Sequence, residues 1–133
     1  MLISDSSKPR EQGEPARLPQ PGRNVIFSVI SLSPSLKNRG QLLEILRSVI
    51  DWGRVCPGRM GCWLSEEDSL QNRIIYAEQW ETEEALHEHI RSDLYRRLLS
   101  AIELSDRPPE VKFYYATESR GFDLVEAIRK RPE

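Results

Sequence analysis

Apolar and polar positions follow two different periods along residues 24 to 129, and the periods change in a regular order. Short β-branched or aromatic runs predict strands at 24–32, 59–65, 73–80 and 111–117. Apolar residues recurring every three or four positions predict helices at 37–54 and 122–129, and a third from Thr82 to about 102 that bends near Ser92-Asp93. The order β-α-β-β-α-β with a C-terminal helix is typical of an α+β, ferredoxin-like fold with a four-stranded antiparallel sheet.

The sequence divides into an N-terminal arm, one domain and a C-terminal extension. Residues 1–23 carry four prolines among serines and charges, which predicts a flexible N-terminal arm with too little apolar surface to fold. We expect one domain over residues 24–118 and a C-terminal helical extension over residues 119–133. A polar turn at 66–69 is expected to join the second and third strands as a hairpin.

The first strand is apolar on both faces. Val25, Phe27 and Val29 lie on one face, and Ile26 and Ile30 lie on the other. An antiparallel sheet that left one face in water would normally alternate apolar with polar residues. The pattern therefore favours a homodimer formed through the uncovered sheet face. The alternative is that the C-terminal helix or the N-terminal arm of the same chain covers that face.

Charge and composition exclude several classes of function. The 19 basic and 21 acidic residues leave a net charge of -2 and contain no long basic run, so no nucleic-acid partner is expected. No apolar stretch approaches the roughly 18 residues of a membrane span, and no signal-peptide core follows Met1, so we expect a cytoplasmic protein without a membrane partner. Cys56 and Cys62 are then free thiols, and their spacing does not suit a zinc site.

Two histidines stand in the third predicted helix, and the helical period separates them. His89 shares the inward stripe of Leu86 and Ile90, whereas His87 faces water, so the two cannot bind one metal ion. A neutral imidazole is a suitable base for a phenolic or quinol hydroxyl. The alternative is a histidine at the edge of the core, hydrogen-bonded to a backbone carbonyl or to a strand side chain.

The strand at 73–80 supplies further candidates on one face. Tyr76 and Trp80 would form a flat apolar wall for an aromatic ligand, with Glu78 as a buried carboxylate between them. A buried carboxylate needs a partner such as Arg73 or His89. The alternatives are core packing for Trp80 and a surface or dimer salt bridge for Glu78. Tyr95 and Trp63 are further candidate walls, each with a structural alternative, and Cys62 is expected in the core.

These residues resemble the antibiotic biosynthesis monooxygenase (ABM) domain of the dimeric α+β barrel superfamily. The family pattern of a strand ending Glu-x-Trp, then Ser/Thr-Glu-Glu-Ala-Leu, then His-x-x-Ser and an aromatic residue stands here as Glu78 to Tyr95, with His89 and Ser92 in place. The resemblance covers about residues 24 to 118. It implies a ferredoxin-like protomer that dimerises through its sheet, with a small-molecule pocket between sheet and helices.

The resemblance also implies chemistry. Members of the family include oxygenases that attack phenols or quinols with no metal or flavin cofactor, and others that degrade heme. Leu94 stands where members often have a second histidine, and Leu99 stands where the heme-degrading branch has its iron ligand. We therefore expect a cofactor-independent monooxygenase acting on a small aromatic, phenolic or quinone-like molecule, with His89, paired with Glu78, as the base. The alternative is a non-catalytic dimeric module that binds a ligand or a partner.

Overall fold

The computed structural model describes residues 25–67 and 72–130. Its strands are β1 (Val25–Leu32), β2 (Arg59–Glu66), β3 (Ile74–Trp80) and β4 (Glu110–Ala116). Its helices are α2 (Leu36–Trp52), α3 (Glu83–Arg91), α4 (Asp93–Ile102) and α5 (Phe122–Arg129). A short 3-10 turn, η2 (Gly53–Val55), follows α2. The strands form one antiparallel sheet in the order β2-β3-β1-β4. This confirms the α+β, ferredoxin-like prediction. The predicted N-terminal arm lies outside the described residues.

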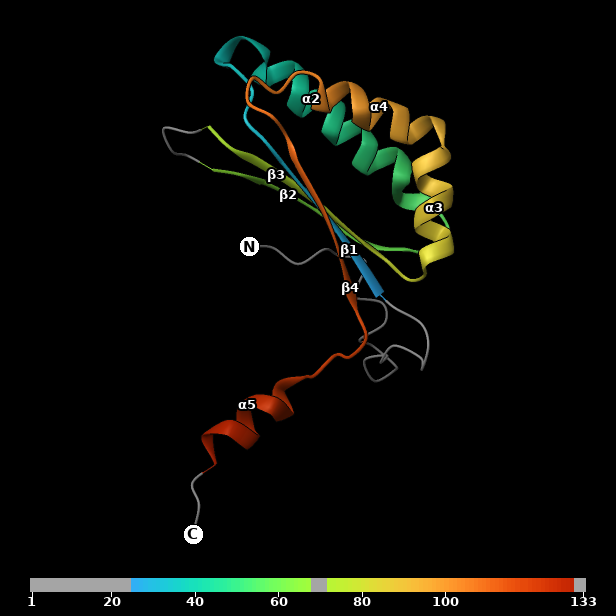
Figure 1. Ribbon diagram of the computed structural model, residues 1–133, viewed down its shortest axis with the longest axis vertical. Helices are drawn as coiled ribbons and strands as arrows, with labels where there is room; N and C mark the ends of the chain where they lie inside the picture. Colours follow the sequence, from blue (N-terminus) through green and yellow to red (C-terminus); the bar gives the residue numbers. More distant parts are fainter. Residues whose placement is uncertain (1–24, 68–71, 131–133) are drawn as a thin grey trace.

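Helices α2, α3 and α4 lie on one side of the sheet, as Figure 1 shows. The burial of β1 alternates strictly, with Ile26, Ser28, Ile30 and Leu32 buried and the residues between them half-buried. Burial alternates in the same way along β3, where Ile74, Tyr76, Glu78 and Trp80 are buried. The helices therefore cover the face to which these even-numbered side chains belong.

Side-chain caps fix where the helices begin. Ser35 accepts a hydrogen bond from the backbone N–H of Asn38 at the start of α2, and Thr82 accepts one from Ala85 at the start of α3. Ser92 separates α3 from α4, and its hydroxyl accepts from the backbone N–H of Tyr95. The bend predicted near Ser92-Asp93 is thus a true end of one helix and a capped beginning of the next.

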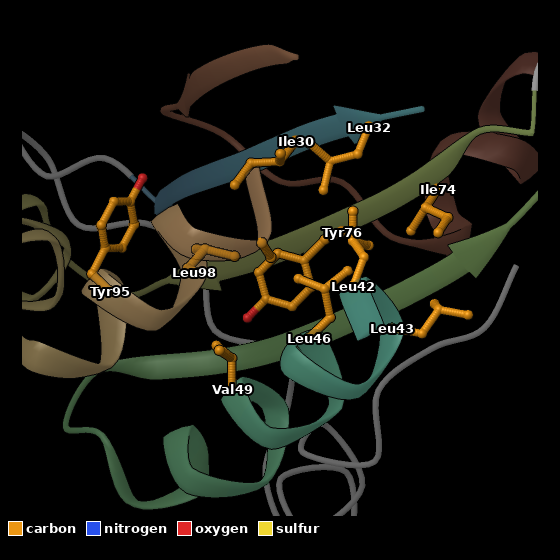
Figure 2. Packing of buried hydrophobic residues seen from close by; sticks show 11 residues of the cluster. Ile30, Leu32, Leu42, Leu43, Leu46, Val49, Ile74, Tyr76, Tyr95 and Leu98 are labelled. Carbon is orange, nitrogen blue, oxygen red and sulfur yellow. The ribbon is translucent and has the colours of Figure 1, made fainter. Parts of the chain in front are cut away.

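The core contains two clusters of buried side chains. The larger lies between the sheet, α2 and α4, and Figure 2 shows Tyr76 of β3 in it, reaching towards Leu46 and Val49 of α2. The smaller contains Ile26, Trp80 and Leu86 at the other end of the sheet, beneath α3. Polar residues are buried between these two clusters, and they make up the candidate site.

The second face of the sheet is not covered by the described part of the chain. Phe27, Val29 and Ala77 are only half-buried there, and Tyr114 is 51% exposed. Helix α5 continues away from the end of β4 (Figure 1) and contains no buried residue. The alternative in which the C-terminal helix folds over this face is therefore wrong for the chain's own sheet. Within the described residues, no helix is both long and apolar enough to span a membrane.

Candidate functional site

The centre of the candidate site is the carboxylate of Glu78, which is fully buried at the middle of β3. The hydroxyl of Tyr76 donates a hydrogen bond to Oε2 at 2.6 Å, and the indole Nε1–H of Trp80 donates one to Oε1 at 2.9 Å. The three residues alternate along one strand, so their side chains project from the same face of the sheet. The flanking aromatic groups therefore satisfy both carboxylate oxygens inside the core.

His89 reaches the same carboxylate from α3. Its Nε2 lies 3.2 Å from Oε2 of Glu78, and the side chain is 1% exposed. The imidazole lies between two aromatic rings, at 4.5 Å from the ring of Trp80 and at 5.2 Å, edge-on, from that of Tyr95. This packing fixes the position of the ring without using its nitrogens.

The nitrogens of His89 are incompletely bonded. The contact of Nε2 with Glu78 has the distance of an ion pair but not the alignment of a hydrogen bond, and Nδ1 has no partner. We take the Nε2 contact as the interaction that fixes the tautomer, because Glu78 can only accept when ionised and a ring N–H must then face it. Nδ1 is left with a free lone pair, which can accept a proton.

The environment keeps Glu78 ionised. Burial by itself would raise the pKa of this carboxyl, but the close imidazole of His89 and the hydrogen bonds from Tyr76 and Trp80 lower the pKa below its usual value. Burial and the neighbouring carboxylate raise the pKa of Tyr76 and of Tyr95, so both phenols stay neutral. Burial also raises the pKa of the Cys62 thiol to about 11, so this cysteine is not a thiolate at neutral pH.

Most of the predicted site residues are brought together. His89, Glu78, Trp80, Tyr76 and Tyr95 form one contiguous buried cluster. Of the two expected partners of Glu78, His89 lies against it, and this imidazole meets the strand carboxylate at ion-pair distance without a hydrogen bond.

Trp63 does not join this cluster. It pairs with Ala77 in the β2–β3 ladder, whereas Cys62 pairs with Glu78, so Trp63 belongs to the opposite face of the sheet. Its predicted role as a wall of this site is therefore wrong. His87 lies on the surface and pairs with Glu83, as the helical period predicts. In the described part of the chain, no three His, Cys, Asp or Glu side chains gather in an arrangement able to hold a metal ion.

Sequence reasoning missed Ser28. This residue lies directly opposite Glu78 in the β1–β3 ladder and on the same face, is 1% exposed, and has no hydrogen-bond partner for its hydroxyl. The signal was a serine at an inward position of an otherwise apolar strand. Because serine is common in strands, that signal acquires meaning only when the register places it beside the buried carboxylate.

The site occurs in a fold shared with several solved structures. A Deinococcus radiodurans protein, described as a "putative antibiotic biosynthesis monooxygenase", has 21% identity and a TM-score of 0.64 over 72% of this chain and 96% of its own. A Nitrosomonas europaea protein with the same description has 14% identity and a TM-score of 0.60 over 67% and 95%. The chain shares the fold of these two proteins. A third ABM-fold protein, from Caulobacter crescentus CB15, has 14% identity and a TM-score of 0.64 over 71% and 91%.

The comparison with these ABM-fold proteins establishes the architecture, and the identities are too low to carry over an activity. No protein-family model matches the sequence, and no curated protein matches it. The chemistry of the site in this chain therefore follows from its own residues.

Proposed function

We propose that this ABM-fold chain is a cofactor-independent monooxygenase for small phenolic or quinol substrates, with His89 as the base and Glu78 as its partner. The observation that carries the proposal is the buried Glu78–His89 pair, with Nδ1 of the imidazole unpartnered. A buried pair of titratable groups with one free proton-accepting atom is a common feature of catalytic sites.

Each member of the pair has a defined part in the proton transfer. Glu78 holds the Nε2–H tautomer of His89 and stabilises the positive charge that develops when Nδ1 takes a proton. Tyr76 and Trp80 keep the carboxylate in place by their hydrogen bonds at 2.6 and 2.9 Å. The misaligned Nε2 contact is consistent with a base that aligns fully only when a substrate binds.

The proposed reaction starts from a phenol with a free para position. His89 Nδ1 takes the hydroxyl proton, and the phenolate transfers one electron to O2, giving a phenoxyl radical and superoxide. These combine at the para carbon to form a peroxide anion, which takes back the proton from His89 and becomes a hydroperoxide. The hydroperoxide then loses its terminal OH and the para hydrogen as water. The products are one quinone and one water for each phenol and O2 consumed. The substrate supplies all the electrons, so the protein contributes the base, the orientation and the exclusion of water.

The substrate can approach from the β4 side of the sheet. Val111, Phe113 and Tyr115 lie on the helix-facing side of β4, opposite buried residues of β1, and are 38–46% exposed. The helices thus leave this edge of the sheet open. His89 as a whole residue is only 4% exposed, so it needs a local shift to meet a substrate. In this proposal Trp80 and Tyr95 flank the imidazole and keep water from it.

The burial of His89 also favours a second candidate function. A buried polar cluster that no substrate reaches would have one role, which is to specify the packing of the core. The protein would then be a binding or interaction module that catalyses no reaction. The two candidates differ in one property, which is whether a small phenol reaches the imidazole.

Incubation with 1-naphthol under 18O2 tests the oxygenase. We expect one labelled oxygen in 1,4-naphthoquinone, an O2 uptake equal to the quinone formed, and no hydrogen peroxide. His89→Ala should abolish the uptake, and His87→Ala, a matched change on the exposed side of the same helix, should not. If wild-type protein consumes no O2 with 1-naphthol or with a panel of quinols and polyphenols, the binding module is the better function. Uptake that survives in His89→Ala would refute this base.

We further propose that the chain is a cytoplasmic homodimer joined through the open sheet face. The half-buried side chains of Phe27, Val29 and Ala77 support this, because α5 does not cover them. Light scattering at micromolar concentration should give twice the chain mass of 15.4 kDa. A mass of one chain would contradict the dimer.

A further inference from the structure

The hydroxyl of Ser28 is a second unpartnered polar group beside the Glu78–His89 pair. Ser28 is 1% exposed, and its Oγ has no hydrogen-bond partner in the described structure. A buried polar group without a partner is destabilising, so such groups are rare unless a ligand or an ordered water satisfies them. This hydroxyl is not bonded to Glu78, whose oxygens accept hydrogen bonds from Tyr76 and Trp80 and lie against His89.

Register and packing place the two unpartnered groups next to the same carboxylate. Ser28 faces Glu78 across the β1–β3 ladder, and His89 contacts Glu78 from α3, which packs against both strands. The neighbour of Ser28 on its other side is Phe113, 38% exposed on the open edge of the sheet. A molecule that enters from β4 would therefore pass Phe113 and meet Ser28 before His89.

The two groups are also complementary in hydrogen bonding. With Nε2–H directed at Glu78, Nδ1 of His89 can only accept a hydrogen bond, whereas a serine hydroxyl can donate one. A phenolic hydroxyl offers one donor and a lone pair, so it would satisfy both groups at once. After its proton has moved to Nδ1, the phenolate oxygen would retain the Ser28 donor.

We propose that Ser28 donates a hydrogen bond to the oxygen of the bound phenol and stabilises the phenolate that His89 generates. This inference rests on the proposed function, because it assigns a further substrate-contacting residue to the same site. It makes Ser28 the group that lowers the pKa of the bound phenol. A hydrogen bond to a charged oxygen is stronger than one to a neutral oxygen, so the contact favours ionisation.

Binding of 4-nitrophenol tests the proposal without requiring oxygenation. Its para position is blocked, and its phenolate absorbs at longer wavelength than the phenol, so the pKa of the bound probe can be titrated at saturating protein. We expect Ser28→Ala to raise that pKa by about 1 to 2 units relative to wild type. Ser28→Cys, which keeps the approximate volume with a much poorer donor, should give a similar rise.

Ser31→Ala is the matched control, since Ser31 lies on the same strand and points to the opposite face of the sheet. It should leave the pKa of the bound probe unchanged. Thermal unfolding of the free proteins checks the fold, and Ser28→Ala should be at least as stable as wild type because it removes an unpartnered buried hydroxyl.

An unchanged probe pKa in Ser28→Ala and Ser28→Cys would overturn the proposal and leave Ser28 with a structural water only. Failure of 4-nitrophenol to bind wild-type protein would overturn it as well. A pKa of bound 4-nitrophenol that depends on Ser28, together with no O2 uptake from any phenol, would overturn the oxygenase. The phenol site and its contact with Ser28 would then still hold. The two failures are thus distinguishable.

Discussion

Glu78→Gln is the most informative single change in the site, because it removes one charge and almost no volume. The carboxylate of Glu78 accepts hydrogen bonds from Tyr76 and Trp80 and faces Nε2 of His89. An amide has one accepting oxygen and one donating NH2. The indole of Trp80 can only donate, so it takes the oxygen, and the NH2 is turned towards the tyrosine hydroxyl and the imidazole.

The consequence is a reversed tautomer in His89. An NH2 group facing Nε2 requires that nitrogen to accept, so the proton moves to Nδ1, which can then no longer act as a base. The equivalent change in a carboxylate–histidine pair of a serine protease lowers the rate by about 10⁴. We expect the 1-naphthol oxygenation rate of Glu78→Gln to fall by about 10² to 10⁴.

The expected loss of stability is much smaller. Two hydrogen bonds to a charged acceptor become neutral ones, at a cost of about 1 kcal/mol each, and the relief of burying a charge offsets part of this. Glu78→Gln should therefore lose about 1–2 kcal/mol of unfolding free energy. Glu78→Ala leaves Tyr76, Trp80 and His89 without their acceptor, and should lose about 3–5 kcal/mol.

Urea unfolding and O2 uptake, measured on the same preparations, separate the two effects. A Glu78→Gln protein that folds normally and retains more than about a tenth of the wild-type rate would refute the assigned tautomer and the role of Glu78. Complete loss of folding in this variant would instead refute the small stability cost worked out above.

The pH dependence of stability gives a second readout of the same change. The folded pKa of Glu78 lies below its ordinary value of 4.5, so its contribution is fully present above about pH 4.5 and is lost as the pH falls through the folded pKa. Stability of wild type should therefore decline in acid more steeply than that of Glu78→Gln. Parallel curves for the two proteins below pH 4.5 would contradict the lowered pKa of Glu78.

Two further changes test the fold around the site. Ala77→Arg, on the open sheet face, should convert the proposed dimer to monomers in light scattering. Ser100→Arg, on the exposed side of α4, should leave the dimer intact. A dimer that survives Ala77→Arg would contradict this interface. Gly58→Ala should lose about 2–4 kcal/mol of unfolding free energy in urea, because φ is +87° and the new Cβ would lie 2.5 Å from Ala85 Cβ. Gly40→Ala, in open space within α2, should gain about 0.5–1 kcal/mol of unfolding free energy. Equal effects of the two changes would refute the strain assigned to position 58.

Local sequence signals were sufficient for the elements of the fold. The β-branched run of β1 and the capping residues Thr82 and Ser92 act within a few positions, so the strand, the helix starts and the bend between α3 and α4 were all predictable. Boundaries differed by at most two residues, as at the end of α2, where the predicted helix to Arg54 stops at Trp52 and continues as the turn η2.

Long-range pairing decided the parts that were wrong or missed. The face on which Trp63 lies depends on the register of β2 against β3, which is irregular between Arg59 and Gly61. The position of Ser28 beside Glu78 depends likewise on the register of β1 against β3. Neither register is encoded within one segment of the sequence. The alternation of apolar and polar residues therefore predicts which side chains share a face of one strand, but not how that strand aligns with its neighbour.

Neither packing nor charge pairing by itself explains the buried cluster around Glu78. Packing alone does not require a carboxylate at position 78, because a leucine there would avoid the cost of burying a charge among Trp80, Tyr76 and His89. Charge pairing alone would be satisfied once Glu78 meets His89, and would not account for a buried serine hydroxyl left without a partner beside it. A ligand hydroxyl bound between Ser28 and His89 accounts for both features, because it uses the lone pair that Glu78 frees on Nδ1 and the donor that nothing else in the site uses.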